Sequence, residues 1–106
     1  MAKRPFYTHP QPGDERWSNS FDLLFRGLEL ATGGQRLHRP SDYERAIRTC
    51  GEDPAAYDAY LQAFRHGMPP HGGIAIGLER WVGQLVEATN IRSVALFPRD
   101  LHRLAP

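Results

Sequence analysis

The sequence predicts an α+β fold in one small domain, and three observations carry that prediction. A chain of 106 residues can bury only a single modest core. Two stretches, 41–50 and 54–66, repeat apolar residues at helical spacing behind helix-capping residues. Two other stretches are short and favour strands: 21–30 is apolar and bounded by Asn/Ser and by Gly33–Gly34, and 71–77 has small residues with glycines near both ends.

Composition excludes several classes of protein. Lys+Arg is 13 against Asp+Glu 12, so the net charge of +1 offers no charge-based case for a nucleic-acid binder. No apolar run is long enough to cross a bilayer, and the first residues lack the apolar core of a signal peptide. Cys50 is the single cysteine, which excludes an internal disulfide. We expect a cytoplasmic protein without membrane contact.

The first half of the chain is expected to lead from irregular structure into a pair of strands. Residues 1–20 are rich in Pro, Gly and polar groups and predict an irregular lead-in. Residues 21–30 then form one strand, Gly33–Gly34 a turn, and residues 35–38 a second short strand.

Two helices follow, each with a recognisable start. Ser41 and Glu44 form a capping box, and Gly51 ends this helix. Asp53, followed by a proline, caps the second helix, which Gly67 closes. The apolar faces of the two helices are expected in the core, including Tyr43, Ala46, Ile47, Cys50, Tyr57, Tyr60, Leu61 and Phe64.

A strand over 71–77 is expected to run directly into a helix over 78–88. Trp81 and Leu85 lie on one side of that helix and Val82 and Val86 on the other, so the spacing predicts a buried helix. Arg80 falls in its first turn, where the helix dipole disfavours a cation. Either a phosphate bound beside this glycine-rich turn or a nearby acidic side chain accounts for that arginine.

Asp22 and Glu29 are a second candidate site. Two carboxylates beside a glycine turn are suitable ligands for a divalent cation. The alternative is that one faces solvent and the other pairs with Arg26 or Arg36, and the residues alone favour this alternative. The five histidines show no ligand spacing.

Several motifs in order resemble a known family. They are Arg4–Thr8, Phe21–Glu29, Gly34–His38, Gly67–Gly73 and Phe97–Asp100. The whole chain resembles the C-terminal part of the catalytic domain of a class II aminoacyl-tRNA synthetase, the aspartyl-tRNA synthetase of archaeal type. Gly77–Arg80 is similar to the family's motif 3. The asparaginyl enzymes are the nearest alternative, but Gln35–His38 and the chain end resemble the aspartyl branch.

The resemblance implies a fold and a set of site residues. The fold is the C-terminal portion of the class II antiparallel sheet with flanking helices, including the motif 3 strand and helix. Arg36 matches the arginine that holds the aspartate side chain, with Thr32 near the amino acid and the metal. Glu29 and Asp22 match the ligands of Mg²⁺ on ATP, and Arg80 matches the arginine on the terminal phosphates. Gly77, Leu78 and Glu79 are implied to line the nucleotide site, and Arg80 and Glu29 to be catalytic.

Parts of the family pattern have no counterpart in these 106 residues. Nothing resembles motif 1, motif 2 or the anticodon-binding barrel, so 1–106 is expected to be a partial catalytic domain. The first hypothesis is a truncated synthetase fragment with ATP and aspartate determinants that is inactive alone and binds tRNA weakly at most. The second is a non-catalytic paralogue that binds a ligand or a protein. The third is activity through a complementing chain, and self-association is also expected because a truncated sheet exposes its edge.

Overall fold

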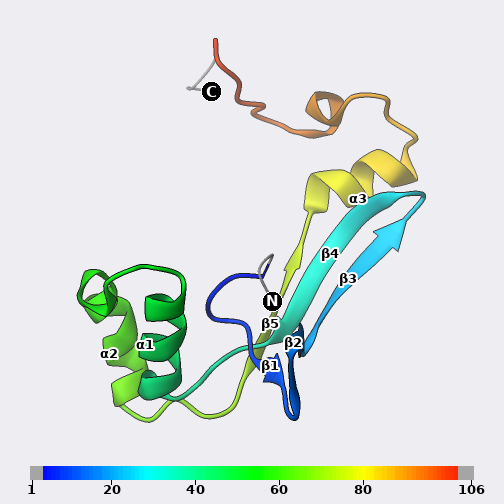
Figure 1. Cartoon of the computed structure of the whole chain (residues 1–106). Coiled ribbons are helices and arrows are strands. Elements are labelled where there is room, and N and C mark those ends of the chain that lie inside the picture. Colours follow the sequence, from blue (N-terminus) through cyan, green and yellow to red (C-terminus); the bar gives the residue numbers. More distant parts are fainter. Residues whose placement is uncertain (1–3, 103–106) are drawn as a thin grey trace. The chain divides into compact units, whose positions relative to one another are not determined.

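A computed structural model describes residues 4–102, and it divides into two compact units. The helical unit comprises Met1–Phe21 and Gly33–Ile74, and the hairpin unit comprises Asp22–Thr32 and Ala75–Pro106. Within residues 4–102, no helix is long and apolar enough to cross a membrane. The structure contains both strands and helices, as expected for the α+β class (Figure 1).

The expected irregular lead-in contains a small sheet instead. β1 (Pro10–Gln11) pairs antiparallel with β2 (Asp14–Ser18). Gly13, between them, has a φ of 87°, a left-handed conformation that suits glycine. The proline-rich composition that indicated irregular structure is therefore the composition of a tight turn with short flanking strands.

The main sheet has the order β3-β4-β5, and its first two strands correct the sequence prediction. The single strand expected over 21–30 is a hairpin of β3 (Ser20–Phe25) and β4 (Leu28–Gln35). Its turn residues, Arg26 and Gly27, have φ values of 48° and 78°. Two-residue hairpin turns of type I′ need positive φ at both positions. Arginine is unusual at the first of these positions, so the sequence did not indicate the turn.

Gly33 and Gly34 lie inside β4 and do not form the expected turn. A Cβ on Gly33 would lie 2.8 Å from Cζ of the Phe21 ring, and one on Gly34 would lie 2.7 Å from the backbone oxygen of Asn19. Glycine at these two positions therefore allows close packing, which is a known role of glycine inside a strand.

β5 (Gly72–Ile76) is confirmed and lies antiparallel to β4. Gly77 N–H donates to Leu30 C=O, and Arg36 N–H donates to His71 C=O. Residue numbers thus rise along one strand as they fall along the other, as in an antiparallel pair. The antiparallel sheet expected from the family resemblance is present.

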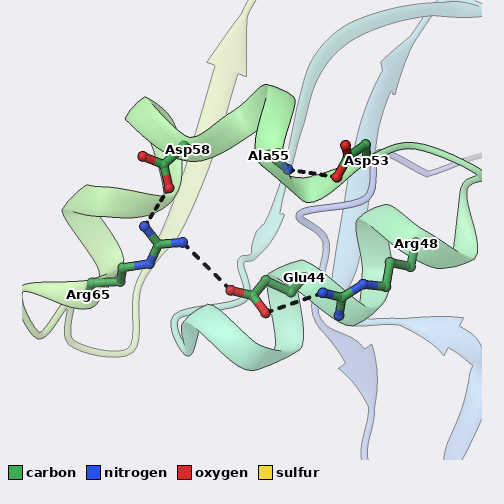
Figure 2. A network of polar contacts seen from close by, with 6 residues as sticks. All are labelled: Glu44, Arg48, Asp53, Ala55, Asp58 and Arg65. Carbon is green, nitrogen blue, oxygen red and sulfur yellow. Dashed lines mark hydrogen bonds and ion pairs between the residues drawn. The ribbon is translucent and has the colours of Figure 1, made fainter.

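α1 (Pro40–Thr49) and α2 (Asp58–Arg65) belong to the helical unit, and α1 begins differently from the prediction. Arg39 is its N-cap with Pro40 in the first turn, and no side chain caps this end. Ser41 lies inside the helix because proline, whose φ suits the first helical position, starts it earlier. Glu44 contacts Arg48 at 3.8 Å and Arg65 at 3.7 Å instead of closing a capping box (Figure 2).

The start of the next helical segment is confirmed. Asp53 accepts a hydrogen bond from Ala55 N–H at 3.0 Å (Figure 2), and Pro54 follows it. The first turn, Pro54–Tyr57, is a 3₁₀ helix that continues into α2. Gly51 and Gly67, with φ values of 83° and 97°, follow the two helices in the left-handed conformation expected at helix ends.

The helical unit has its own core, formed by Leu37, Tyr43, Ile47, Leu61 and Phe64. Four of the eight predicted core positions are buried, Ala46 and Tyr57 are partly buried against this core, and two are exposed. Tyr60 is 40% exposed, and Cys50, expected as a core thiol, is also exposed. Cys50 is the C-cap of α1, where the chain turns away from the apolar stripe.

The hairpin unit contains α3 (Leu78–Leu85) and a 3₁₀ turn, Ile91–Val94. The expected burial of this helix is wrong for the chain as described, because Leu78 is 67% exposed and Leu85 74% exposed. The helix also ends three residues before Ala88. Apolar residues on two sides of a helix indicate that both sides suit burial, but they do not supply the neighbours that bury them.

Candidate functional site

Arg80 and Glu29 meet within the hairpin unit. Arg80 Nη1 donates to the backbone oxygen of Glu29 at 2.7 Å and lies 3.5 Å from its Oε1. Both side chains are about half exposed, so this ion pair contributes roughly 0–1 kcal/mol. Of the two explanations for a cation in the first helical turn, the structure shows the acidic neighbour. The exposed guanidinium still has free edges for an anion.

Gly77 allows this approach. It is the N-cap of α3, and a Cβ at this position would lie 3.1 Å from Arg80 Cδ. The arginine stem therefore folds back over the glycine toward β4. Leu78 and Glu79 follow in the first turn of α3, so all four residues of the expected nucleotide-binding segment surround one strand-to-helix junction.

Asp22 and Thr32 are brought together across the hairpin. Thr32 Oγ1 donates to Asp22 Oδ1 at 2.6 Å. Arg26, considered as a partner for the acidic pair, contacts Glu87 at 3.4 Å. No group of three or more His, Cys, Asp or Glu side chains that could hold a metal exists in the described part of the chain.

The donor chemistry nevertheless fits magnesium. Mg²⁺ is usually held by one or two carboxylates together with waters and substrate phosphates, so a dedicated cluster of protein ligands is not required. Asp22 and Glu29 supply such carboxylates from adjacent strands, β3 and β4. The metal-binding role of Asp22, Glu29 and Thr32 stays a prediction.

Arg36 lies in the helical unit, directly after β4. Its guanidinium carbon is 5.0 Å from the centre of the Tyr7 ring, a cation–π distance. On another side, a Cβ at Gly73 would lie 2.8 Å from Arg36 Nη2. The arginine is half-buried, and among residues 4–102 its guanidinium has no hydrogen bond or ion pair. A positioned, partly desolvated guanidinium without a carboxylate is a candidate anion-binding group.

Tyr7 and Gly73 are the site residues that sequence reasoning missed. Both lie inside quoted motifs, Arg4–Thr8 and Gly67–Gly73, yet neither motif indicates contact with Arg36. The bridge between Thr8 and Arg36 is the pairing that brings the aromatic ring to the arginine. Such long-range pairing leaves no periodic signal in a sequence.

Comparison with known proteins decides the family. The model of the family "tRNA synthetases class II (D, K and N)" matches residues 1–101. This chain belongs to that family. An aspartate–tRNA(Asp/Asn) ligase of Thermus thermophilus is 50% identical over 103 residues, which are 97% of this chain and 24% of the relative. A cytoplasmic aspartate–tRNA ligase of Arabidopsis thaliana is 50% identical over 105 residues, or 99% of this chain and 20% of the relative.

Solved structures agree with the sequence relatives. The aspartyl-tRNA synthetase of Entamoeba histolytica matches with a TM-score of 0.90 and 45% identity, covering 100% of this chain and 22% of that one. An asparaginyl-tRNA synthetase of the same organism, in complex with asparaginyl-adenylate, matches with a TM-score of 0.88 and 34% identity, covering 100% and 25%. The class II synthetase fold expected from the sequence is thus confirmed. The chain spans about a fifth to a quarter of the length of these relatives.

Proposed function

We propose that this chain carries the aspartate-binding and ATP-binding residues of an aspartyl-tRNA synthetase active site and does not form aspartyl-adenylate by itself. Arg36 carries the proposal. Its guanidinium is held between the Tyr7 ring and Gly73 and has no carboxylate partner among the described residues. A planar fork held in this way suits two parallel hydrogen bonds to the side-chain carboxylate of aspartate.

The nucleotide role is assigned to the hairpin unit. Arg80 would exchange its contact with Glu29 for the terminal phosphates of ATP, and Gly77–Glu79 would line the nucleotide. Asp22 and Glu29, with the Thr32 hydroxyl, would hold Mg²⁺ on the phosphates. The ion would neutralise phosphate charge, while the residues position the triphosphate for displacement of pyrophosphate by the aspartate α-carboxylate.

The proposed inactivity of the isolated chain rests on a part of the family pattern that the 106 residues do not contain. Motif 2 supplies the family's arginine for the α-phosphate and the platform for adenine, and no segment resembles it. Removing one positioned donor at a reacting centre lowers a rate by about 10²–10³-fold. The absence of all the motif 2 residues from the active site should therefore abolish adenylation. Transfer to tRNA would need the same missing parts, and only weak contact with tRNA is proposed. The cytoplasm is the proposed location.

A second candidate is a non-catalytic, ligand-binding or protein-binding paralogue. The observation in its favour is the core of the helical unit, where Tyr43, Ile47 and Leu61 have an exposed fraction of 0%. Such a core can support Arg36 and Tyr7 without the rest of a synthetase. A third candidate is catalysis after assembly with a complementing synthetase chain. The exposed apolar side chains of the hairpin unit favour such an assembly, or self-association.

NMR titration of the ¹⁵N-labelled chain with L-aspartate tests the main proposal. We expect saturable shifts of the Arg36 Nε–H and the Gly73 amide, no such shifts with L-asparagine, and their loss in Arg36→Ala. Arg48→Ala, which removes an exposed arginine of α1, is the control and should keep them. Identical responses to both amino acids would contradict the aspartate assignment.

Aspartate-dependent exchange between ATP and pyrophosphate tests the second half. The pure 106-residue chain should show none above background. Robust exchange by a monomer would refute the inactivity of the isolated chain. Exchange that appears only after addition of a synthetase fragment containing motifs 1 and 2 would select the complementation alternative.

A further inference from the structure

Among residues 4–102, two residues other than glycine have a left-handed backbone, and their side chains contact each other. Arg26 has a φ of 48° and Glu87 a φ of 53°. Arg26 Nη1 lies 3.4 Å from Glu87 Oε1, although the two residues are 61 positions apart in the chain. This contact, the turn–helix pair, joins the turn between β3 and β4 to the end of α3 within the hairpin unit.

Both positions have a backbone that suits glycine better than the residue present. Glu87 directly follows Val86, the C-cap of α3, at the position where helices commonly end in a left-handed glycine. Ala88 N–H donates to Gly83 C=O at 2.9 Å, the hydrogen bond that such a helix end forms. Arg26 occupies the first position of a type I′ turn, where asparagine, aspartate or glycine is usual.

The turn–helix pair does not compensate for this backbone strain. A left-handed backbone disfavours most residues that have a Cβ by roughly five- to thirtyfold, and the strain arises twice. The accessible fraction is 57% for the Arg26 side chain and 76% for that of Glu87, so the contact favours the folded state by at most about fivefold. Strained residues of this kind cluster at functional sites. The two side chains therefore indicate a role other than fold stability.

α3 depends on polar contacts for its position because none of its residues is buried. At its start, Gly77 N–H donates to Leu30 C=O at 2.9 Å. In its first turn, Arg80 donates to the backbone oxygen of Glu29 at 2.7 Å. At its other end, the turn–helix pair supplies the contact with the hairpin.

The lengths of the helix and the hairpin match between these contacts. Residue numbers rise from 77 to 87 along α3 while they fall from 30 to 26 along the hairpin (Figure 1). Ten helical residues span about 15 Å and four extended residues about 13 Å. The contacts therefore hold both ends of α3 against the same part of the hairpin.

We propose that Arg26 and Glu87 are positioning residues of the nucleotide site, because they hold the end of α3 on the hairpin turn and the helix in turn holds Arg80 beside Glu29. The inference rests on the proposed function, in which Arg80 binds the terminal phosphates of ATP. Arg26 and Glu87 act through the helix and need no contact with the nucleotide. A glycine at either position would relieve the strain but could not form the contact.

Two substitutions separate fold stability from the position of Arg80. Glu87→Gly and Arg26→Asn each introduce a residue that the left-handed backbone accepts, and each removes the turn–helix pair. The urea midpoint of the full chain should therefore stay the same or rise. ¹⁵N relaxation of the Arg80 Nε–H, measured without nucleotide, should show increased mobility. Side chains that only stabilise the fold would lower the urea midpoint when they are removed.

Exchange of the two charges tests the pair itself. Arg26→Glu and Glu87→Arg, made separately, place like charges in contact and should increase the mobility of the Arg80 side chain. The dissociation constant for ATP with Mg²⁺ should rise by about two- to fivefold in each, the range of an exposed ion pair. The double variant should restore both quantities. Asp100→Asn, which weakens the 3.2 Å pair with Arg92 in the same unit, is the control and should change neither.

Two results would overturn the proposal. They are unchanged Arg80 mobility in both Glu87→Gly and Arg26→Asn, and a double charge variant that is no better than the single variants. The first would show that the contact of α3 with the 3₁₀ turn Ile91–Val94 is enough to place the helix.

Failure of the proposed function would look different. The phosphate role of Arg80 would be refuted if ATP with Mg²⁺ caused no shift in the wild-type chain that Arg80→Ala removes. The relaxation measurements contain no nucleotide, so they would still support or overturn the positioning of Arg80 by the turn–helix pair.

Discussion

The two units differ in how many of their apolar side chains are buried. In the helical unit Tyr43, Ile47 and Leu61 are fully buried and pack around one core. In the hairpin unit many large apolar side chains are exposed, among them Leu24, Leu85 and Leu96 at 64%, 74% and 86%. The helical unit thus has a core of several fully buried side chains, although it also exposes Trp17 and Ile74, whereas the hairpin unit has the surface of a piece that packs against something else. This contrast agrees with a chain that matches only part of longer relatives.

The largest effect expected from this contrast is on stability, and two Leu→Ala substitutions measure it. Leu61 is 0% exposed, so Leu61→Ala should lower the free energy of unfolding by about 2–5 kcal/mol. Leu85→Ala removes the same atoms from an exposed position of α3 and should change it by less than about 0.5 kcal/mol. Urea denaturation followed by circular dichroism compares them. Similar losses in both variants would show that the hairpin unit is covered in solution, for instance by self-association.

Alkaline pH should destabilise the helical unit through Tyr43. Burial, together with the Tyr60 hydroxyl, raises the pKa of Tyr43 above its ordinary value. Above pH ~10 the unfolded chain releases this proton and the folded chain keeps it, so the free energy of unfolding falls by about 1.4 kcal/mol per pH unit. Below that pH the full stability is present.

Tyr43→Phe removes this contribution. Denaturation curves between pH 7 and pH 12 should therefore show a smaller alkaline loss in the variant than in the wild type, with a constant difference at pH 7–9. Parallel curves over the whole range would contradict the burial of the Tyr43 hydroxyl.

Gly73→Ala tests the positioning of Arg36 with little effect on stability. The new Cβ would lie 2.8 Å from Nη2, the end of a flexible side chain, so the guanidinium should move away while the free energy of unfolding changes by less than about 1 kcal/mol. The aspartate-induced NMR shifts should be lost. Gly83→Ala is the control, since its Cβ would lie 3.8 Å from Val94 and should stabilise α3 by about 0.5–1 kcal/mol. Aspartate shifts that persist in Gly73→Ala would show that Arg36 does not need this position.

A small stability effect is also expected at Arg80. Its pair with Glu29 is half exposed, so Arg80→Ala should lower the free energy of unfolding by less than about 1 kcal/mol. We expect ATP with Mg²⁺ to cause weak NMR shifts in the wild-type chain, and the same substitution should remove them. Arg92→Ala removes another exposed arginine of the hairpin unit, paired with Asp100 at 3.2 Å, and should keep those shifts. ATP binding that survives in Arg80→Ala would refute the assignment of this arginine to the phosphates.

Local signals in the sequence predicted the elements that depend on neighbouring residues. Asp53 before a proline predicted the start of a helical turn, and the structure shows its cap bond to Ala55. The hairpin escaped prediction because Arg26 occupies a left-handed position that usually selects asparagine, aspartate or glycine. Gly33 and Gly34 were expected to form a turn because glycine is common in turns. Glycine also occurs inside strands where a neighbouring group comes close, and the sequence does not show which neighbour approaches.

The candidate site also contains some features that the sequence predicted and others that it did not. Motif resemblance led to Arg36, Arg80 and Glu29, and the structure places Arg80 on Glu29. The contact of Tyr7 with Arg36 depends on a pairing between segments almost 30 residues apart, a separation that follows from their numbers. Exposure of α3 could not be predicted either, because an apolar helix face does not reveal what lies against it.

The order of elements in the main sheet also bears on how fast the chain folds. β3 and β4 are joined by two residues, and a hairpin of this kind closes in about 1–10 μs. β5 follows β4 only after α1 and α2 (Figure 1), so the β4–β5 pairing closes a long loop. Distant pairings of this kind slow folding because the loop entropy is lost before the contacts form. The compact helical core forms within this loop and reduces its effective length. Variants that weaken the core, such as Leu61→Ala, should therefore slow the pairing of β5 with β4.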